Sequence, residues 1–379
     1  MRILHTSDWH LGISFQGRMF LEDQQFFINE ICNIVKEEQI DCVLIAGDVY
    51  DRSIAGNEAI DLFDSCMKRI CLDLGTKVMV IAGNHDGARR LSTCSELLKK
   101  SGLFIAGALE KDAFVYEEGN VSIFLLPWIS TDKARAVFPE KADEIKTIED
   151  AYRVSADNCR AAFKEGNVNI LCAHAFITNS ETSVSDRAAV VGTATEVSAS
   201  VFDGFDYVAL GHIHKPQDVN EHVRYSGTPM PYSFGKEETQ EKSVTVFDTE
   251  TLEKTVILLP LYRKRMTLTG TYEEIMTGDY PKEVTDAYIR VKLTDSPVTL
   301  ETFARLNELF PNLLEAAGTT LNDDGMELTL TPEDLEQRKN NPEEIFRQYY
   351  IDSFGTEPDE HLTSLFEKAL EMYSKEVEE

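Results

Sequence analysis

Five short polar motifs contain most of the residues in this chain that could carry out chemistry. Each motif directly follows a run of mostly apolar residues. In chain order they are Asp8-Trp9-His10, Gly47-Asp48-Val49-Tyr50-Asp51-Arg52, Gly83-Asn84-His85-Asp86, the single residue His174, and Gly211-His212-Ile213-His214. Together they hold five of the eight histidines in the sequence. Imidazole, carboxylate and amide donors without a thiolate suit Mn²⁺, iron or Zn²⁺, so the motifs predict a metal centre.

The runs that precede the motifs predict buried strands. They are short, mostly apolar and rich in branched side chains, and they span residues 3–6, 42–46, 78–82, 168–172 and 207–210. Apolar residues at helical spacing lie between several of them, in 26–35 and in 54–73. This alternation predicts an α/β sandwich. Because the carboxyl ends of strands in such a sheet meet at one edge, the five motifs are expected to converge there.

More strands are predicted in the middle of the chain, and after Pro260 the composition changes and a separate small domain is predicted. Segments 115–116 and 121–126 predict a hairpin, and 244–247 and 256–259 predict further strands. Beyond them we expect a small α+β domain with strands at 266–271, 287–293 and 326–331 and a helix at 300–316. The predicted domains are therefore 1–262, 263–336 and a C-terminal segment, 337–379.

The C-terminal segment has the pattern of a short linker followed by two amphipathic helices. Residues 337–341 are polar, Asn341 is a suitable N-cap, and Pro342 fits the first helical position. Apolar residues recur at helical spacing in 345–350 and again in 362–373. Such helices either pack on their own domain or dock on a partner, and the pattern leaves both readings open.

The charge balance limits the possible functions. The chain has 37 Lys and Arg against 66 Asp and Glu, a formal net charge of −29. A protein that binds DNA by itself is usually basic, so a nucleic-acid function would need metal ions or a basic partner as a local positive source. The sequence contains no uninterrupted run of about 18 apolar residues, so it predicts no membrane span. Seven cysteines without a C-x-x-C pair are typical of reduced thiols, which favours a cytoplasmic location.

The motifs D-x-H, G-D-x-x-D, G-N-H-D, H and G-H-x-H resemble those of the calcineurin-like metallophosphoesterases, over residues 1 to about 260. That family has a four-layer α/β/β/α sandwich. The resemblance implies two divalent metal ions. It assigns one to Asp8, His10, Asp48 and His214, and the other to Asp48, Asn84, His174 and His212. All seven ligand positions are occupied by suitable residues.

Two-metal hydrolysis of a phosphate ester is the reaction that this resemblance implies. His85 is not assigned to a metal, so we expect it to act as general acid or to stabilise charge on the phosphoryl oxygens. Asp51, three residues beyond Asp48, is predicted to orient His85. The alternative for Asp51 is a local turn cap.

Three longer segments point to DNA as the substrate. Residues 1–12, 205–217 and 225–238 resemble the SbcD family of nuclease subunits, and the resemblance extends to a capping domain and the terminal helices. It implies Mn²⁺, a 3′→5′ double-strand exonuclease, and a single-strand endonuclease that opens hairpins. It also implies a partner, the coiled-coil ATPase SbcC. ATP would act only through that partner, because the chain has no G-x-x-x-x-G-K-[ST] loop.

The same resemblance implies a homodimer within a heterotetramer, with 54–73 and 91–101 as candidate dimer helices; ordinary core packing would produce the same apolar spacing. Some relatives carry a histidine where Asp51 stands, which leaves the balance of exo- and endonuclease activity open. The competing hypotheses are a stand-alone phosphomonoesterase or cyclic-nucleotide phosphodiesterase, and a scaffold that only binds a partner.

Overall fold

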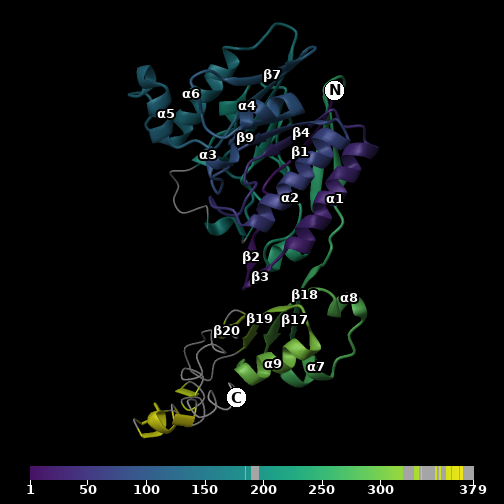
Figure 1. Ribbon diagram of the computed structural model, residues 1–379, viewed down its shortest axis with the longest axis vertical. Coiled ribbons are helices and arrows are strands. Elements are labelled where there is room, and N and C mark those ends of the chain that lie inside the picture. The colour runs from purple at the N-terminus through teal and green to yellow at the C-terminus, as the bar shows by residue number, and fades with distance from the viewer. Residues whose placement is uncertain are drawn as a thin grey trace. The chain divides into compact units, whose positions relative to one another are not determined.

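The computed structural model describes residues 1–183, 185–188, 196–318, 328–332, 334, 346–347, 350, 356–359, 361–366 and 368–369. The chain divides into two compact units (Figure 1). Unit 1 comprises residues 1–13 and 19–265, and unit 2 comprises 14–18 and 266–379. Within the described residues, no helix has the length and apolar character needed to cross a membrane.

The first sheet of unit 1 carries three of the five motifs. Its strand order is β16-β15-β1-β4-β5-β6. The strands are β1 (Arg2–Thr6), β4 (Cys42–Ala46), β5 (Lys77–Ile81), β6 (Leu103–Ala106), β15 (Ser243–Asp248) and β16 (Glu253–Leu258). Strands β1, β4, β5 and β6 run parallel, and β15 and β16 are antiparallel additions beside β1. Because β1, β4 and β5 are parallel neighbours, their carboxyl ends share one edge.

The second sheet carries the other two motifs. Its order is β13-β14-β12-β9-β8-β7. The strands are β7 (Phe114–Glu118), β8 (Val121–Leu126), β9 (Val168–His174), β12 (Tyr207–Gly211), β13 (Gln217–Asp218) and β14 (Val223–Tyr225). Strands β8, β9, β12 and β14 are parallel, while β7 and β8 form the predicted hairpin. The predicted strands at 168–172 and 207–210 are thus confirmed.

The two sheets pack face to face and helices cover their outer sides, which confirms the α/β/β/α sandwich. Alternate residues of each strand meet between the sheets, such as Leu44 and Met79 from one and Ile170 and Ala209 from the other. The residues between them point outward and are also buried. The main helices are α1 (Leu21–Glu37), α2 (Asn57–Met67), α5 (Thr131–Val137) and α6 (Ile148–Arg160). Helices α5 and α6 pack on the second sheet, and α1 and α2 lie over the first (Figure 1).

Shorter elements connect these layers. A π-helix, Lys68–Asp73, continues α2, so the predicted helix at 54–73 changes type near its end. The segment 91–101 is broken into short turns, because Cys94 has φ 59° between α3 (Ala88–Leu91) and α4 (Ser95–Leu98). The remaining short strands are β2 (Ser14–Phe15), β3 (Arg18–Met19), β10 (Phe176–Ile177) and β11 (Glu196–Val197). The 3₁₀ turns are Lys99–Ser101, Pro139–Lys141, Ser185–Ala188, Ala199–Phe202 and Gly235–Glu238.

Unit 2 contains a four-stranded sheet in the order β17-β18-β19-β20. Its elements are β17 (Arg265–Gly270), α7 (Tyr272–Thr277), α8 (Lys282–Thr285), β18 (Tyr288–Leu293), α9 (Leu300–Leu309), β19 (Leu313–Gly318) and β20 (Leu328–Leu330). Phe303 and Leu306 of α9 pack with Ile289 and Leu313 in one apolar cluster. The predicted small α+β fold is therefore present.

The prediction of one helix over 300–316 was wrong in its second half. Helix α9 ends at Leu309, and Phe310 has extended backbone angles (φ −120°, ψ 90°). Pro311 disfavours a helical conformation for the residue before it and cannot donate a helical hydrogen bond. The apolar run that follows is β19, a buried strand paired parallel with β18.

Only part of the C-terminal segment can be compared with its prediction. Residues 361–366 are helical, as the pattern in 362–373 predicted for that stretch. The expected linker at 337–341 and the expected helix start at Asn341 and Pro342 lie outside the described residues.

Candidate metal centre

The seven predicted ligands lie where five strands end. Asp8 and His10 follow β1, Asp48 follows β4, and Asn84 follows β5. From the facing sheet, His174 is the last residue of β9, and His212 and His214 follow β12. Because the two sheets pack against each other with these ends on the same side, side chains that are up to 206 residues apart in the sequence (Asp8 to His214) meet.

One group of donors consists of Asp8, His10 and His214. One donor atom from each lies within 4.8 Å of the others, and all three residues are buried. The Nε2 atoms of His10 and His214 face each other at 3.2 Å. Two neutral imidazoles that present lone pairs to each other are mutually unsatisfied unless a proton or a cation lies between them. This donor set therefore fits a divalent metal ion.

A second group consists of Asp48, His174 and His212, with donor atoms again within 4.8 Å. The Asn84 side-chain oxygen lies 3.0 Å from His174 Nε2 and 3.0 Å from His212 Nδ1. Asp48 Oδ2 lies 3.3 Å from His174 Nε2 and 3.9 Å from His10 Nε2. Asp48 thus stands between the two groups, in the position expected of a carboxylate that bridges two ions.

Backbone contacts orient His174. Its Nδ1–H donates a hydrogen bond to the Ala46 carbonyl over 2.8 Å. This leaves Nε2, which faces Asp48 and Asn84, as the atom that can bind a metal ion. The glycine at 47 makes this approach possible. A Cβ on Gly47 would lie 2.4 Å from His174 Nδ1, and the residue has φ +88°. The glycine at this position is therefore required both by the backbone angle and by the space that the imidazole occupies.

Four of the seven predicted ligands adopt a left-handed backbone conformation. Asp8, His10 and Asp48 have φ of 53°, 41° and 50°, and His212 has φ 103°. Each such residue costs about 1–3 kcal/mol and persists only where the surroundings hold it. Backbone hydrogen bonds do so here, from Asp8 N to the Gly47 carbonyl and from His10 N to the Asp48 carbonyl, both 3.0 Å. Backbone strain of this kind is common at functional sites.

Burial shapes the protonation of the ligands. It lowers the pKa of His212 to about 3 and of His214 to about 4, so both imidazoles are neutral and able to bind a metal near pH 7. Burial also raises the pKa of Asp8 to about 7. Burial lowers the pKa of His174 too, but the charge of Asp48 outweighs it and raises that pKa to about 9. The Asp48 carboxylate thus favours the protonated form of His174, and a cation bound between them would compete with that proton.

His85 lies beside the two groups without belonging to either predicted ligand set. Its ring packs edge-on against His10, with centroids 4.9 Å apart, and it is half-buried. Its backbone N–H donates to Asp48 Oδ1 over 2.9 Å. Its Nδ1 donates to the backbone carbonyl of Asp51 over 2.9 Å. This arrangement leaves Nε2 available for proton transfer.

The contact between Asp51 and His85 runs through the main chain of Asp51. The carboxylate of Asp51 instead lies 3.7 Å from His10 Nδ1 and 3.5 Å from Arg52 Nε. Within the described part of the chain, His10 Nδ1 is buried and has no hydrogen-bond partner, and the Asp51 carboxylate lies just beyond hydrogen-bonding distance of it. His10, Asp51 and His85 also have donor atoms within 4.8 Å of one another.

Sequence reasoning missed residues that support the ligands from behind. Asp86 accepts the backbone N–H groups of Val49, Tyr50 and Gly83 at 3.1, 3.0 and 2.9 Å, and so ties two ligand loops together. Its place as the last residue of G-N-H-D was the available signal. Around His214, the missed residues are Ser185, Asp186, Glu237 and Lys242. They come from segments that contain none of the five motifs.

The chain matches known families over most of its length. A model of the calcineurin-like phosphoesterase family matches residues 1–216. The SbcD C-terminal model, described as the type 5 capsule protein repressor C-terminal domain, matches residues 262–354. The SbcD subunit of the nuclease SbcCD from Staphylococcus epidermidis is 33% identical over 318 residues, which are 83% of this chain and 84% of that protein.

Two solved structures are similar at 12% identity. One is GAP50, the anchor in the inner membrane complex of Plasmodium, with a TM-score of 0.38 over 86% of this chain and 98% of that one. The other is a dimetal phosphatase from Danio rerio, with a TM-score of 0.36 over 68% of this chain and 99% of that one. Both likenesses are too low to bear on function. From the matches over residues 1–216 and 262–354 and the 33% identical relative, it follows that this chain belongs to the calcineurin-like phosphoesterase family and, within it, to the SbcD family.

Proposed function

We propose that the chain is a metal-dependent DNA nuclease, the SbcD-like component of a complex with a coiled-coil ATPase of the SbcC type. Its activities are a 3′→5′ exonuclease on double strands and an endonuclease on single strands and hairpins, used in DNA recombination, replication and repair. The observation that carries the proposal is the convergence of seven residues with N and O donors in two neighbouring groups, with Asp48 between them. The relative named as part of the nuclease SbcCD supports DNA as the substrate.

The residues divide the chemical tasks. Divalent cations, when bound, would supply Lewis acidity and lower the pKa of an attacking water. Asp8, His10, Asp48 and His214 would hold one cation, and Asp48, Asn84, His174 and His212 the other. Mn²⁺ suits these mixed imidazole and oxygen donors.

His85 protonates the leaving oxygen in this proposal. Its Nδ1–H is held by the Asp51 carbonyl, so the imidazolium form carries its second proton on Nε2, and this is the proton that it transfers, which leaves the neutral ring. The Asp51 carboxylate, 3.7 Å from His10 Nδ1, orients a ligand instead of orienting His85 by its side chain. Asp51 thereby contributes to the site through both its main chain and its side chain.

DNA must be held beside a chain of net charge −29. Arg52, whose side chain is 75% exposed, and the exposed Arg89 and Arg90 lie on the loops and short helix next to His85 and can contact phosphates. The ATPase partner supplies the remaining positive surface and the ATP requirement, and the C-terminal helices are its docking site. The complex works in the cytoplasm, at the nucleoid.

The oligomer in this proposal is a homodimer within a heterotetramer. Ile54 is 69% exposed and Leu97 is 70% exposed, and each lies in one of the two segments expected at the dimer interface. Burial against a second copy of the chain would remove the apolar surface of these two side chains from water.

The test is cleavage of a DNA hairpin by the purified chain with Mn²⁺, beside the His85→Ala protein and a chromogenic phosphomonoester. The proposal expects DNA cleavage that the variant loses, with weak or no phosphomonoester turnover. Turnover of the phosphomonoester or of a cyclic nucleotide without DNA cleavage, even after the ATPase partner is added, would establish the small-substrate hydrolase instead. Full biological function of the His85→Ala protein would favour the scaffold hypothesis.

A further inference from the structure

A buried chain of polar groups leads away from His214 on the side opposite the metal centre. His214 Nε2 faces His10, whereas His214 Nδ1 lies 2.6 Å from the Ser185 hydroxyl. The same hydroxyl contacts the Glu237 carboxylate at Oε1. The three groups therefore form a continuous hydrogen-bonded path from an imidazole ligand to a carboxylate.

The contacts of Glu237 determine the direction of these hydrogen bonds. Its Oε2 accepts the Tyr232 backbone N–H over 2.8 Å, and its Oε1 accepts the Ser233 hydroxyl over 2.6 Å. Burial alone would raise the pKa of Glu237, but Lys242 and the two serine hydroxyls outweigh it and lower that pKa to about 2. An ionised carboxylate only accepts hydrogen bonds, so Ser185 donates its one proton to Glu237. The oxygen of Ser185 is then left to accept from His214 Nδ1–H.

Lys242 connects to both ends of this path. It is completely buried, and its Nζ lies 3.6 Å from Glu237 Oε2. The same ammonium group donates to the His214 backbone carbonyl at 3.3 Å, to Thr228 Oγ1 at 2.8 Å and to Gln240 Oε1 at 2.9 Å. A buried Lys–Glu pair contributes little net stability, because desolvation offsets the attraction. The pair instead contacts His214 at two points: Lys242 binds its backbone carbonyl, and Glu237 reaches its ring through Ser185. These contacts indicate that the pair positions His214.

Asp186 is the other acceptor near the imidazole. Its Oδ1 accepts the His214 backbone N–H over 3.0 Å and lies 3.4 Å from His214 Nδ1. Ser185 is closer to Nδ1 by 0.8 Å, the difference between 3.4 and 2.6 Å. Asp186 therefore anchors the backbone of His214, and Ser185 is the partner of its ring.

We propose that Ser185, Glu237 and Lys242 form a positioning relay that keeps the proton of His214 on Nδ1 and so presents the Nε2 lone pair to the cation shared with Asp8 and His10. The arrangement resembles the carboxylate–histidine–metal triads in which an outer carboxylate fixes the tautomer of a ligand, with a serine hydroxyl inserted between them. This inference rests on the proposed function, because it requires that the centre binds metal.

The Glu237→Gln substitution reverses the relay with almost no change in shape. The amide oxygen must take the Oε2 position, since the Tyr232 N–H points there and can only donate. The NH₂ group then replaces Oε1 and donates to Ser185. The Ser185 hydroxyl has two other neighbours, His214 Nδ1 at 2.6 Å and Ser183 Oγ at 2.9 Å, and it donates to the nearer one, His214 Nδ1. The proton of His214 is thereby transferred to Nε2, the atom that should bind metal.

The experiment titrates the full chain, freed of metal with a chelator, with Mn²⁺ in a calorimeter. The wild type is expected to bind two ions. Glu237→Gln should weaken one of them about 10–100-fold and leave the other unchanged. Ser185→Ala should produce the same loss, and Ser185→Thr, which keeps the hydroxyl, should restore binding. The matched control is Glu241→Gln, the same chemical change at an exposed position four residues away.

A second measurement reports the tautomer without metal or activity. In protein labelled with ¹⁵N-histidine, the His214 resonance should have the Nδ1–H pattern in the wild type and the Nε2–H pattern in Glu237→Gln. Unchanged tautomer and unchanged Mn²⁺ affinity in folded Glu237→Gln and Ser185→Ala would overturn the relay while leaving the nuclease proposal intact. A wild type that binds no Mn²⁺ would overturn both. If Glu237→Gln does not fold, Ser185→Ala and Ser185→Thr decide the matter alone.

Discussion

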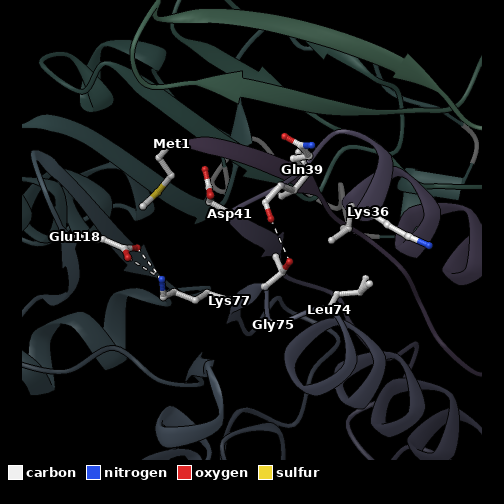
Figure 2. A pocket seen from close by; sticks show the side chains of 11 residues that line it. Met1, Lys36, Gln39, Asp41, Leu74, Gly75, Lys77 and Glu118 are labelled. Carbon is white, nitrogen blue, oxygen red and sulfur yellow. Dashed lines mark hydrogen bonds and ion pairs between the residues drawn. The ribbon is translucent and has the colours of Figure 1, made fainter.

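The two ends of the first sheet of unit 1 differ in how far their polar groups are exposed to water and in how those groups are paired. At the amino ends of β4 and β5 lies an open hollow of about 530 Å³, lined by residues that include Met1, Lys36, Asp41, Lys77 and Glu118 (Figure 2). At the carboxyl ends of the same strands, Asp48 and Asn84 meet imidazoles from the facing sheet. This hollow is at the end of the sheet opposite the metal-binding motifs.

The charges at the two ends are satisfied in different ways. In the hollow, Lys77 donates to both carboxylate oxygens of Glu118, and both side chains remain in contact with water, 34% and 43% exposed (Figure 2). Positive φ angles there belong to Gln39 and Gly75, which directly follow helix ends, where that conformation is common. At the carboxyl end the donors of both groups are buried and face one another, and four of the seven predicted ligands have a positive φ. The buried donors that converge at the carboxyl end therefore mark the candidate site, and the open hollow at the amino end does not.

The largest effect is expected from His85→Ala. Removing the proton donor should lower kcat for DNA cleavage about 10²–10⁴-fold, while both Mn²⁺ ions still bind, because His85 is outside the ligand sets. Single-turnover cleavage and calorimetry measure the two quantities. The matched control is His222→Ala at an exposed histidine. Equal cleavage by wild type and His85→Ala would remove His85 from the mechanism.

A pair of glycine substitutions compares the two ends directly. Gly47→Ala adds a Cβ 2.4 Å from His174 Nδ1 at φ +88°, whereas Gly75→Ala at φ +71° meets nothing within 4 Å. Gly75→Ala should therefore cost only the strain of a left-handed residue, about 1–2 kcal/mol of unfolding free energy. Gly47→Ala should cost more and should also weaken Mn²⁺ binding. Urea unfolding and calorimetry check this, and equal losses at both positions would contradict the assigned role of Gly47.

The buried Lys242–Glu237 pair predicts a pH dependence of stability. The pKa of Glu237 falls from 4.5 to about 2 on folding, so the folded state favours the ionised form. Ionisation of Glu237 alone contributes roughly 3 kcal/mol, which is present above about pH 4.5 and is lost as the pH falls toward about 2. Burial lowers the pKa of Lys242 and offsets this gain in the net stability of the pair, but not over this pH window. The difference in unfolding free energy between the wild type and Glu237→Gln should shrink over that window. A difference that stayed constant down to pH 2 would contradict the shift.

The exposed Lys77–Glu118 pair should show the smallest effect. The hydrogen bond between the two side chains raises the pKa of Lys77 and lowers the pKa of Glu118. Both side chains remain in contact with water, however, so solvent screens the interaction. Lys77→Met should change the unfolding free energy by less than about 1 kcal/mol and leave DNA cleavage unchanged. A large loss of cleavage would show that the amino end of the sheet takes part in function, and the contrast between the two ends would fail.

The sequence by itself was sufficient for the sandwich and for the group of donors. Short, mostly apolar runs and period-3.6 patterns predict which segments are buried, and the shared direction of the strands then brings Asp8, Asp48, Asn84, His174 and His212 together. The same reasoning failed at 300–316, because the apolar run of β19 has the spacing of a helix and only Pro311 signals the break. The fold class follows from such local patterns, and single boundaries depend on the packing around them.

Only the tertiary structure decided how the donors are held. No local pattern showed that His85 contacts the main chain of Asp51, or that Ser185 and Glu237 reach His214 from segments 29 and 23 residues away. Hydrogen bonds of this kind depend on the distance and direction between two side chains in the folded chain. A serine or glutamate that makes such a bond looks the same in the sequence as one that does not, so the sequence does not reveal it. The motifs therefore predict which residues are ligands, whereas the tautomers and angles of those residues follow from the folded surroundings.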